Sequence, residues 1–214
     1  MHAVNPSHGR ECGEPRLSTI HSRLLGKLTL HVNDCVYEPS DDSLLLVEGL
    51  EVLYEEGRRY DSVVDVGTGT GVLALAAFKL FRPSRLAAVD VSPCSLESAS
   101  LNLPREALIA RCNGLTCIRG SWDLAIVNPP YLPLSSVDEP YTCEEMVEAS
   151  WSGLGVFEGL IKGVASRARE LLVAYSSLSP TRAESVLGPL GFRTRILGRE
   201  RFFMEEIYVV HAVR

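Results

Sequence analysis

The sequence predicts an α/β fold with a mainly parallel β-sheet in one domain. From residue 61 onward, short apolar runs alternate with amphipathic segments, an order typical of strands joined by helices that cover both faces of a sheet. The chain has 214 residues, of which 46% are hydrophobic, enough for one domain with a full core. Residues 1–27 lack sustained periodicity, so we expect a flexible N-terminal extension before a domain that spans residues 28–214.

Two elements are expected before the regular part of the chain. Residues 28–32 alternate between apolar and polar side chains, as a short strand does. Ser40 or Asp41 can cap the helix that follows. The apolar residues of that helix recur at roughly helical spacing and are Leu44, Leu45, Val47, Leu50 and Leu53.

The regular part of the chain predicts a seven-stranded sheet. The strands are expected at residues 62–66, 85–90, 108–112, 122–127, 170–176, 191–197 and 202–213. The helices are expected at residues 71–81, 93–103, 156–169 and 180–190. A short link joins the last two strands, so we expect a mostly parallel sheet that ends in an antiparallel C-terminal hairpin.

Charge and hydropathy exclude several classes of protein. The net charge of −6 disfavours a dedicated duplex-binding protein, because such proteins bind largely by neutralising phosphates. We interpret the local exception, Arg193, Arg195, Arg199 and Arg201, as a solvated strand and turn. No apolar run approaches the roughly 18 residues that a membrane helix needs, and residues 1–16 lack the apolar region of a secretory signal. We therefore expect a cytoplasmic protein without a membrane segment.

The six cysteines show neither a C-x-x-C pair nor a histidine spacing suited to zinc. We therefore predict no metal site and free intracellular thiols. Disulfides would be expected only if the source grows at high temperature. The absence of glutamine and the excess of arginine over lysine hint at such a source, although a GC-rich genome also favours arginine.

Residues 65–71 (DVGTGTG) lie where a strand meets a helix and indicate a ligand that resembles a nucleotide. Their glycines allow a tight turn and a close approach of the backbone to a ligand, although a turn without a ligand is the alternative. Val72 stands where the dinucleotide fingerprint has glycine or alanine, so NAD is not indicated. Asp90 ends the next strand and can accept both ribose hydroxyls of an adenosine. Asp65 can face an ammonium group of the ligand or cap the turn.

Residues 128–131 (NPPY) follow the expected strand 122–127 and carry the strongest chemical signal. Two prolines end the strand and stiffen the backbone. The Asn128 side-chain oxygen and the Pro129 carbonyl can then hold both hydrogens of a planar NH2 group and orient its nitrogen for reaction. Tyr131 can stack on the flat group. A stiff turn in which Asn128 is only a local cap is the structural alternative.

These motifs together resemble the class I, Rossmann-like S-adenosylmethionine-dependent methyltransferases that modify amide or exocyclic amino nitrogens. Residues 36–50 (VYEPSDDSLLLVEGL) are similar to the entry motif of the HemK-like release-factor glutamine methyltransferases. The chain has no room for a helical domain before residue 61, and residues 198–210 are similar to the C-terminal ending of the short archaeal and eukaryotic branch. The resemblance covers residues 28–214.

The resemblance implies S-adenosylmethionine as cofactor and assigns site residues position by position. The residues that would hold the acceptor are Asn128, Pro129, Pro130 and Tyr131. The residues that would bind the cofactor are Asp42, Ser43, Asp65, Gly67, Thr68, Gly69, Gly71, Asp90, Val91, Asn113 and Asn128. Two features depart from the family pattern. Asn113 stands where an aspartate that binds the adenine amino group is usual, and the turn after Trp151 is shorter.

The function implied is methylation of a glutamine side-chain amide in the Gly-Gly-Gln loop of a class I peptide chain release factor. The alternative is an adenine exocyclic-amino methyltransferase that acts on RNA or DNA, but the acidic chain has no spare length for a recognition domain. A third hypothesis is a non-catalytic module that holds the cofactor, which the intact NPPY motif disfavours. The resemblance also implies a small zinc-containing activator protein as a partner, and nucleic acid is not expected as one.

Overall fold

The structure, a computed structural model, describes residues 12–129 and 153–214. The strands of its main sheet are β3 (Ser62–Val66), β4 (Arg85–Asp90), β5 (Leu108–Arg111), β6 (Trp122–Val127), β7 (Ala168–Ser176), β8 (Arg193–Arg201) and β9 (Glu206–Val213). They lie in the order β5-β4-β3-β6-β7-β9-β8. The five strands from β5 to β7 are parallel, whereas β9 runs antiparallel to β7 and β8 antiparallel to β9. The predicted α/β fold and its C-terminal hairpin are confirmed.

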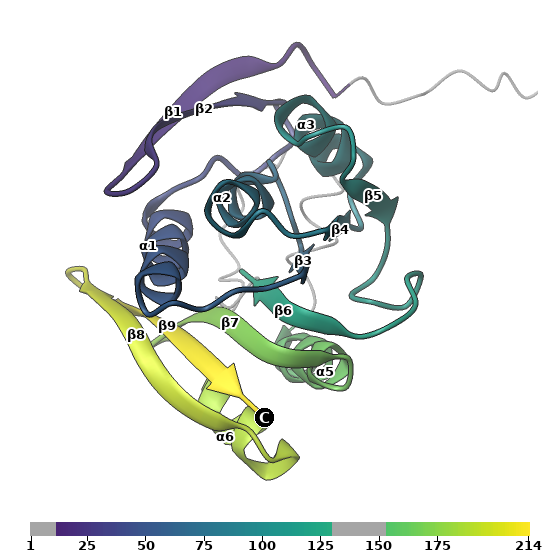
Figure 1. The fold of residues 1–214 in the computed structure, drawn as a ribbon. Helices are drawn as coiled ribbons and strands as arrows, with labels where there is room; N and C mark the ends of the chain where they lie inside the picture. Colours follow the sequence, from purple (N-terminus) through teal and green to yellow (C-terminus); the bar gives the residue numbers. More distant parts are fainter. Residues whose placement is uncertain (1–11, 130–152) are drawn as a thin grey trace, which may run out of the picture.

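Helices cover both faces of this sheet (Figure 1). One face carries α1 (Asp41–Glu55), α2 (Val72–Phe81) and α3 (Pro93–Asn102), and the other carries α5 (Gly153–Ala165) and α6 (Ala183–Leu187), which leads into a 3-10 turn at Gly188–Leu190. Val63 of β3 packs in the first core and its neighbour Val64 in the second. Because the strand is buried on both faces, it reads as a continuous apolar run in the sequence. No helix of the two described ranges is long and apolar enough to cross a membrane.

An N-terminal hairpin corrects one expectation from the sequence. β1 (Arg16–Ser22) pairs antiparallel with β2 (Gly26–Val32), so part of the predicted flexible extension is a strand. The expected strand at 28–32 belongs to β2. Ile20 is the one residue of β1 that is buried, so β1 shows no alternation that would predict it. Its pairing partner and the helices below the hairpin, not its own apolar residues, determine that it forms.

The cysteines correct a second expectation. Cys12 is bonded to Cys94 and Cys112 to Cys117, with Cα–Cα distances of 5.3 and 5.6 Å, and Cys35 is disulfide-bonded as well. The prediction of free thiols is therefore wrong for the described cysteines. Cys12 lies 82 residues before Cys94, and a pairing at that separation is decided by tertiary contact. The basic stretch forms β8, an edge strand whose four arginines are exposed, as predicted.

Candidate active site

Three neighbouring strands bring the predicted site residues to one edge of the sheet. Val89, Val66 and Val127 are register partners in β4, β3 and β6. Asp90, Gly67 and Asn128 follow them directly and so lie at the carboxyl ends of parallel strands. The chain proceeds from β3 to β4 and β5 on one side and from β6 to β7 on the other. This reversal of strand order is the place where open α/β sheets bind ligands.

The turn from β3 to α2 has the backbone conformation that its glycines predict. Gly67, Gly69 and Gly71 have positive φ angles of 74°, 52° and 82°. The amides of Gly67 and Thr68 donate to the carbonyl of Val89 at 2.8 and 3.0 Å, which fastens the turn to β4. A Cβ on Gly67 would point toward the Asn128 carbonyl oxygen at 3.8 Å. The turn therefore lies beside the end of β6, and Gly67 and Gly69 leave room for a ligand to approach its backbone.

Asp65 is fully buried beneath this turn. Its Oδ2 accepts hydrogen bonds from the Thr68 hydroxyl at 2.7 Å and from the Ala74 amide at 3.1 Å. Its Oδ1 is buried and has no hydrogen-bond partner among the described residues. Burial raises the pKa of Asp65 to about 7. A carboxylate so placed would gain a partner and keep its charge if a cationic group of a ligand reached it.

Asp90 is held by the turn and by the start of α3. Its Oδ2 accepts from the Gly69 amide and its Oδ1 from the Ser92 amide, both at 2.9 Å. Burial raises the pKa of this carboxyl as well, against the opposing effect of these bonds. Each carboxylate oxygen has a second lone pair. Both oxygens can therefore still accept hydroxyl hydrogens from a ribose.

Val91 and Asn113, which were predicted for the adenine end, lie at the same edge of the sheet. Val91 follows Asp90 and is 37% exposed. The Arg111 guanidinium donates to the Val91 carbonyl at 2.9 Å, so β5 is fastened to this segment. Asn113 is exposed, and its carbonyl accepts from Thr116. The position of Asn113 is compatible with the predicted contact, which stays a prediction.

Asn128 and Asp42 form the feature that the sequence did not predict. Nδ2 of Asn128 donates to Oδ2 of Asp42 at 3.0 Å. Oδ1 of Asn128 is buried and finds no hydrogen-bond partner within the described parts of the chain. Asp42 therefore fixes which way the Asn128 amide faces, and the acceptor oxygen is left for another group. Pro129 is buried, whereas Pro130, Tyr131, Trp151 and Ser152 lie outside the described residues.

The first turn of α1 holds the Asp42 carboxylate in place. Oδ1 of Asp42 accepts from the Ser43 amide at 2.6 Å, from the Ser43 hydroxyl at 3.2 Å and from the Ser40 hydroxyl at 3.1 Å. The Tyr37 and Ser40 hydroxyls are 2.6 Å apart. A chain of hydrogen bonds therefore runs from Tyr37 to Asn128. The sequence analysis predicted Asp42 and Ser43 to lie beside a cofactor. Tyr37 and Ser40 belong to the motif at residues 36–43 but were not predicted as site residues, because their role depends on the hydrogen bond between Asp42 and Asn128.

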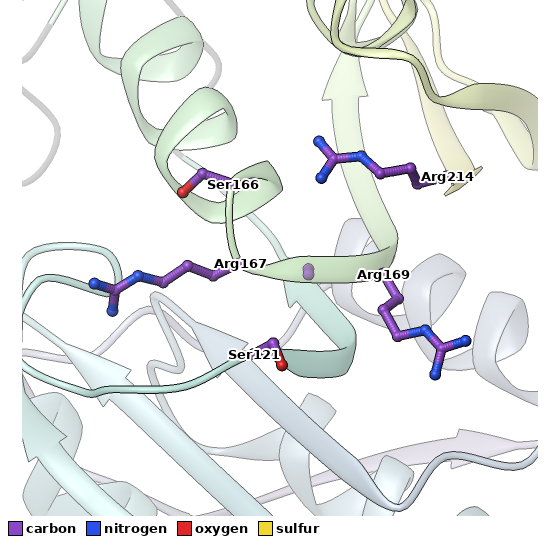
Figure 2. Close-up of a pocket in the computed structure, with 6 residues that line it drawn as sticks. Ser121, Ser166, Arg167, Arg169 and Arg214 are labelled. Atoms are coloured by element: carbon purple, nitrogen blue, oxygen red, sulfur yellow. The ribbon is translucent and has the colours of Figure 1, made fainter.

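The pocket drawn in Figure 2 lies at the opposite edge of the sheet, where β6 and β7 begin, and has a volume of about 240 Å³. It is lined by Ser121, Ser166, Arg167, Ala168, Arg169 and Arg214. Arg167 donates to the carbonyls of Leu115 and Ile118, and the Arg214 guanidinium lies over the Phe192 ring. The arginines do not converge on one point (Figure 2). None of the predicted site residues lines this pocket.

The polar atoms at the carboxyl edge of the sheet fit S-adenosylmethionine. Two buried side-chain oxygens, Asp65 Oδ1 and Asn128 Oδ1, have no partner among the described residues. They belong to residues at the carboxyl ends of β3 and β6, beside a turn in which Gly67 and Gly69 leave room for a ligand. An ammonium group, which the cofactor carries, would satisfy the Asp65 carboxylate. A planar NH2 group, such as that of an acceptor amide, would satisfy the Asn128 oxygen.

Known methyltransferases are similar to this chain in sequence or in fold. A putative protein N5-glutamine methyltransferase of Methanocaldococcus jannaschii is 27% identical over 88% of this chain and 95% of its own length. A release factor glutamine methyltransferase of Bradyrhizobium diazoefficiens is 28% identical over 60% of this chain, which spans 46% of that relative. Mtq2 of E. cuniculi, solved as an Mtq2–Trm112 complex responsible for the methylation of the eRF1 translation termination factor, has a TM-score of 0.62 at 25% identity and covers 84% of this chain and 98% of its own.

The family assignment rests on more than half of the chain. Residues 38–169 match the model of the family described as the methyltransferase small domain. This range includes α1 with Asp42, the glycine turn, Asp90 and Asn128, which together build the site at the carboxyl edge of the sheet. The protein belongs to the methyltransferase small domain family.

Proposed function

We propose that this protein transfers a methyl group from S-adenosylmethionine to the side-chain amide nitrogen of a glutamine in a protein, within the Gly-Gly-Gln loop of a class I release factor. The carrying observation is the fixed Asn128 amide, whose Nδ2 is bound to Asp42 and whose Oδ1 is buried without a described partner. The names of the M. jannaschii and B. diazoefficiens relatives and the eRF1 methylation ascribed to the Mtq2–Trm112 complex support the acceptor.

The cofactor would lie along the glycine turn, with its ammonium group at Asp65 and its ribose hydroxyls at Asp90. Thr68 donates to Oδ2 of Asp65, and the buried Oδ1, which has no partner among the described residues, would accept from the ammonium group. Val91 and Asn113 would border the adenine. When bound, S-adenosylmethionine supplies the electrophilic methyl group. The residues of the chain bind and orient the cofactor, and the closely packed turn excludes water from its amino acid end.

The acceptor glutamine would be held by its amide hydrogens. Oδ1 of Asn128 would accept one of them, and the carbonyl of Pro129 the other. An amide nitrogen is a weak nucleophile because its lone pair is delocalised, so its orientation matters more than a strong base. The carboxylate of Asp42 prevents the Asn128 amide from turning its NH2 group toward the acceptor. Pro130 and Tyr131, as stiffener and stacking partner, complete the proposed acceptor site.

The proposal is tested with a labelled methyl donor. Purified protein should transfer label to a class I release factor and should spare the same factor in which the loop glutamine is replaced by alanine. Persistent labelling of the altered factor would place the methyl group on another residue. Label that appears only on RNA or DNA would overturn the proposal in favour of an adenine amino acceptor.

A second measurement separates acceptor binding from cofactor binding. Asn128→Ala should reduce methyl transfer by at least roughly a hundredfold, because it removes an oriented hydrogen-bond acceptor at the reacting nitrogen. The affinity for S-adenosylmethionine, measured by calorimetry, should stay close to that of the unaltered protein. Loss of both would show that Asn128 mainly shapes the cofactor site.

A small activator protein belongs to the same proposal. The complex of Mtq2 with Trm112 is the supporting observation. We propose a small zinc-containing partner for this chain, and we propose that both proteins act in the cytoplasm. The test compares methylation of the release factor with and without such a protein from the same source. Equal rates, together with separate elution of the two proteins in gel filtration, would contradict it.

A further inference from the structure

The tip of the β8–β9 hairpin lies at the same edge of the sheet as the acceptor site. β7 runs parallel to β6, so both end at the edge that carries Asn128. Ser176 at the end of β7 pairs with Ile207 at the start of antiparallel β9. The four residues that join β8 to β9, residues 202–205, therefore project from that edge. Figure 1 shows this hairpin beside α1, the helix that carries Asp42.

The hairpin tip is a fixed structure with two apolar side chains that face solvent. The Phe202 amide donates to the Glu205 carbonyl at 2.7 Å, and the Phe202 side chain packs against the core. Phe203 and Met204 between them are 99% and 77% exposed. Aromatic and methionine side chains are enriched in protein interfaces relative to the rest of the surface. We call Phe203 and Met204 the tip surface.

The hairpin that carries the tip surface packs against α1, the helix that carries Asp42. A Cβ on Gly198 of β8 would lie 2.9 Å from the Leu45 side chain of α1. The first turns of α1 therefore pack directly on the hairpin. Burial raises the pKa of Tyr37, the hydrogen bond with Ser40 lowers it, and the charges of Asp42, Asp41 and Glu205 raise it. Tyr37 is 55% exposed and begins the hydrogen-bond chain that ends at Asn128.

We propose that the tip surface is a docking site for the protein that carries the acceptor glutamine. This inference rests on the proposed function and adds a place where the body of the acceptor protein binds outside the acceptor site. A glutamine side chain occupies only the acceptor site, so a protein acceptor must also cover the adjoining edge of the sheet. Glu205 and Glu206 follow the tip surface, and Arg201, whose Nε lies 3.6 Å from Glu206, precedes Phe202. The charges beside the tip surface are therefore mixed and do not form the basic patch that a phosphate backbone requires.

The test compares a whole release factor with a short peptide that contains its glutamine loop. In the double variant Phe203→Ala with Met204→Ala, the KM for the factor should rise roughly tenfold, as expected when apolar anchors of an interface are truncated. The kcat at saturation, the KM for the peptide and the affinity for S-adenosylmethionine should stay within about twofold of the unaltered protein. Because both side chains face solvent, their truncation should leave the thermal unfolding midpoint unchanged.

Leu24→Ala is the matched control. Leu24 is 41% exposed in the turn between β1 and β2, and its amide donates to Glu51 in the C-terminal half of α1, away from the acceptor edge. This variant should leave every kinetic constant unchanged. An unchanged KM for the factor in the double variant would overturn the docking site while leaving the proposed function intact. Equal increases in the KM for the factor and for the peptide would overturn it as well. So would a dimer of the unaltered protein that dissociates in the double variant. If the unaltered protein methylates no factor, the proposed function itself fails.

Discussion

At the scale of single residues, the contact between Asp42 and Asn128 decides how the acceptor would be read. An asparagine side chain can present either its oxygen or its NH2 group, and the polypeptide sequence does not specify which. Here Oδ1 of Asp42 is occupied by the first turn of α1, and Oδ2 accepts from Asn128. The side chain of Asn128 therefore presents an acceptor, which is the group that an amide NH2 requires.

Asp42→Asn should weaken catalysis without unfolding the protein. An asparagine has one acceptor oxygen, so it cannot accept both from the Ser43 amide and from Asn128 Nδ2. We expect kcat to fall by about tenfold to a hundredfold, the cost of one or two misplaced hydrogen bonds. Single-turnover kinetics with saturating cofactor would measure it. The neighbouring Asp41→Asn, at an exposed position, is the control and should have no effect. A loss confined to cofactor affinity would contradict the positioning role of Asp42.

Asp65 should make stability depend on pH in the absence of ligand. Its folded-state pKa of about 7 lies above the ordinary value of 3.8, so the folded state favours the protonated carboxyl. The free energy of unfolding should therefore fall as the pH rises from about 4 to about 7, by on the order of 3 kcal/mol. Urea unfolding at a series of pH values would measure this decrease. The decrease should be absent in Asp65→Asn, and a variant with the same pH profile as the unaltered protein would refute the assignment.

At the scale of elements, the start of α2 depends on a glycine for two separate reasons. Gly71 has a φ of +82°, and a Cβ there would lie 3.2 Å from Leu103 Cγ and 3.3 Å from Ala99. The positive φ alone disfavours any other residue. The contact with α3 adds a steric cost, because neither neighbour is the end of a long flexible side chain. The sequence motif thus predicted the turn, while the second reason became visible only in the packing of α2 on α3.

Gly71→Ala and Gly57→Ala separate these two costs. Gly57 has nearly the same φ, +81°, but a Cβ there would meet nothing within 4 Å. Gly57→Ala should lower the free energy of unfolding by about 1 kcal/mol and leave cofactor affinity unchanged. Gly71→Ala should cost about 1 kcal/mol more and weaken S-adenosylmethionine binding. Denaturant unfolding and calorimetry would measure both quantities; equal stability of the two variants would show that the packing around Gly71 relaxes freely.

At the scale of the whole molecule, one disulfide fastens distant parts of the chain and another closes a short loop. Cys12–Cys94 joins the segment before β1 to the first turn of α3 across 82 residues, whereas Cys112–Cys117 spans 5. In the chain-entropy model a cross-link stabilises more when it closes a longer loop. The first disulfide should therefore contribute more to global stability, and the second should act mainly on the loop that holds Asn113.

Paired serine variants test this difference. Cys12→Ser with Cys94→Ser should lower the free energy of unfolding by about 4 kcal/mol, and Cys112→Ser with Cys117→Ser by about 2 kcal/mol. Denaturant unfolding with and without a thiol reductant would measure both. The reductant should lower the free energy of unfolding of the unaltered protein more than it lowers that of either double variant. If the reductant has no effect on the unaltered protein, these disulfides do not form in solution.

The sequence alone determined the order of the regular elements and the chemistry at the ends of β3, β4 and β6. β3, β4 and β6 are short apolar runs that end before Gly67, at Asp90 and before Asn128 and Pro129, so local preferences and burial act in the same direction. It was for this reason that the bounds expected for β3, β4 and β6 agree with the structure. The glycine turn, Asp90 and Asn128 were likewise found because each stands at a strand end.

Only the tertiary structure decided the features that depend on partners far apart in the chain. β1 forms because β2 and the helices lie beside it, and Cys12 meets Cys94 because the hairpin packs on α3. The orientation of Asn128 depends on Asp42, which lies 86 residues earlier. Hydrogen bonds and disulfides between distant segments leave no periodicity in the sequence. The sequence therefore indicated which residues carry the chemistry, and the fold determined which atoms of those residues face the reaction.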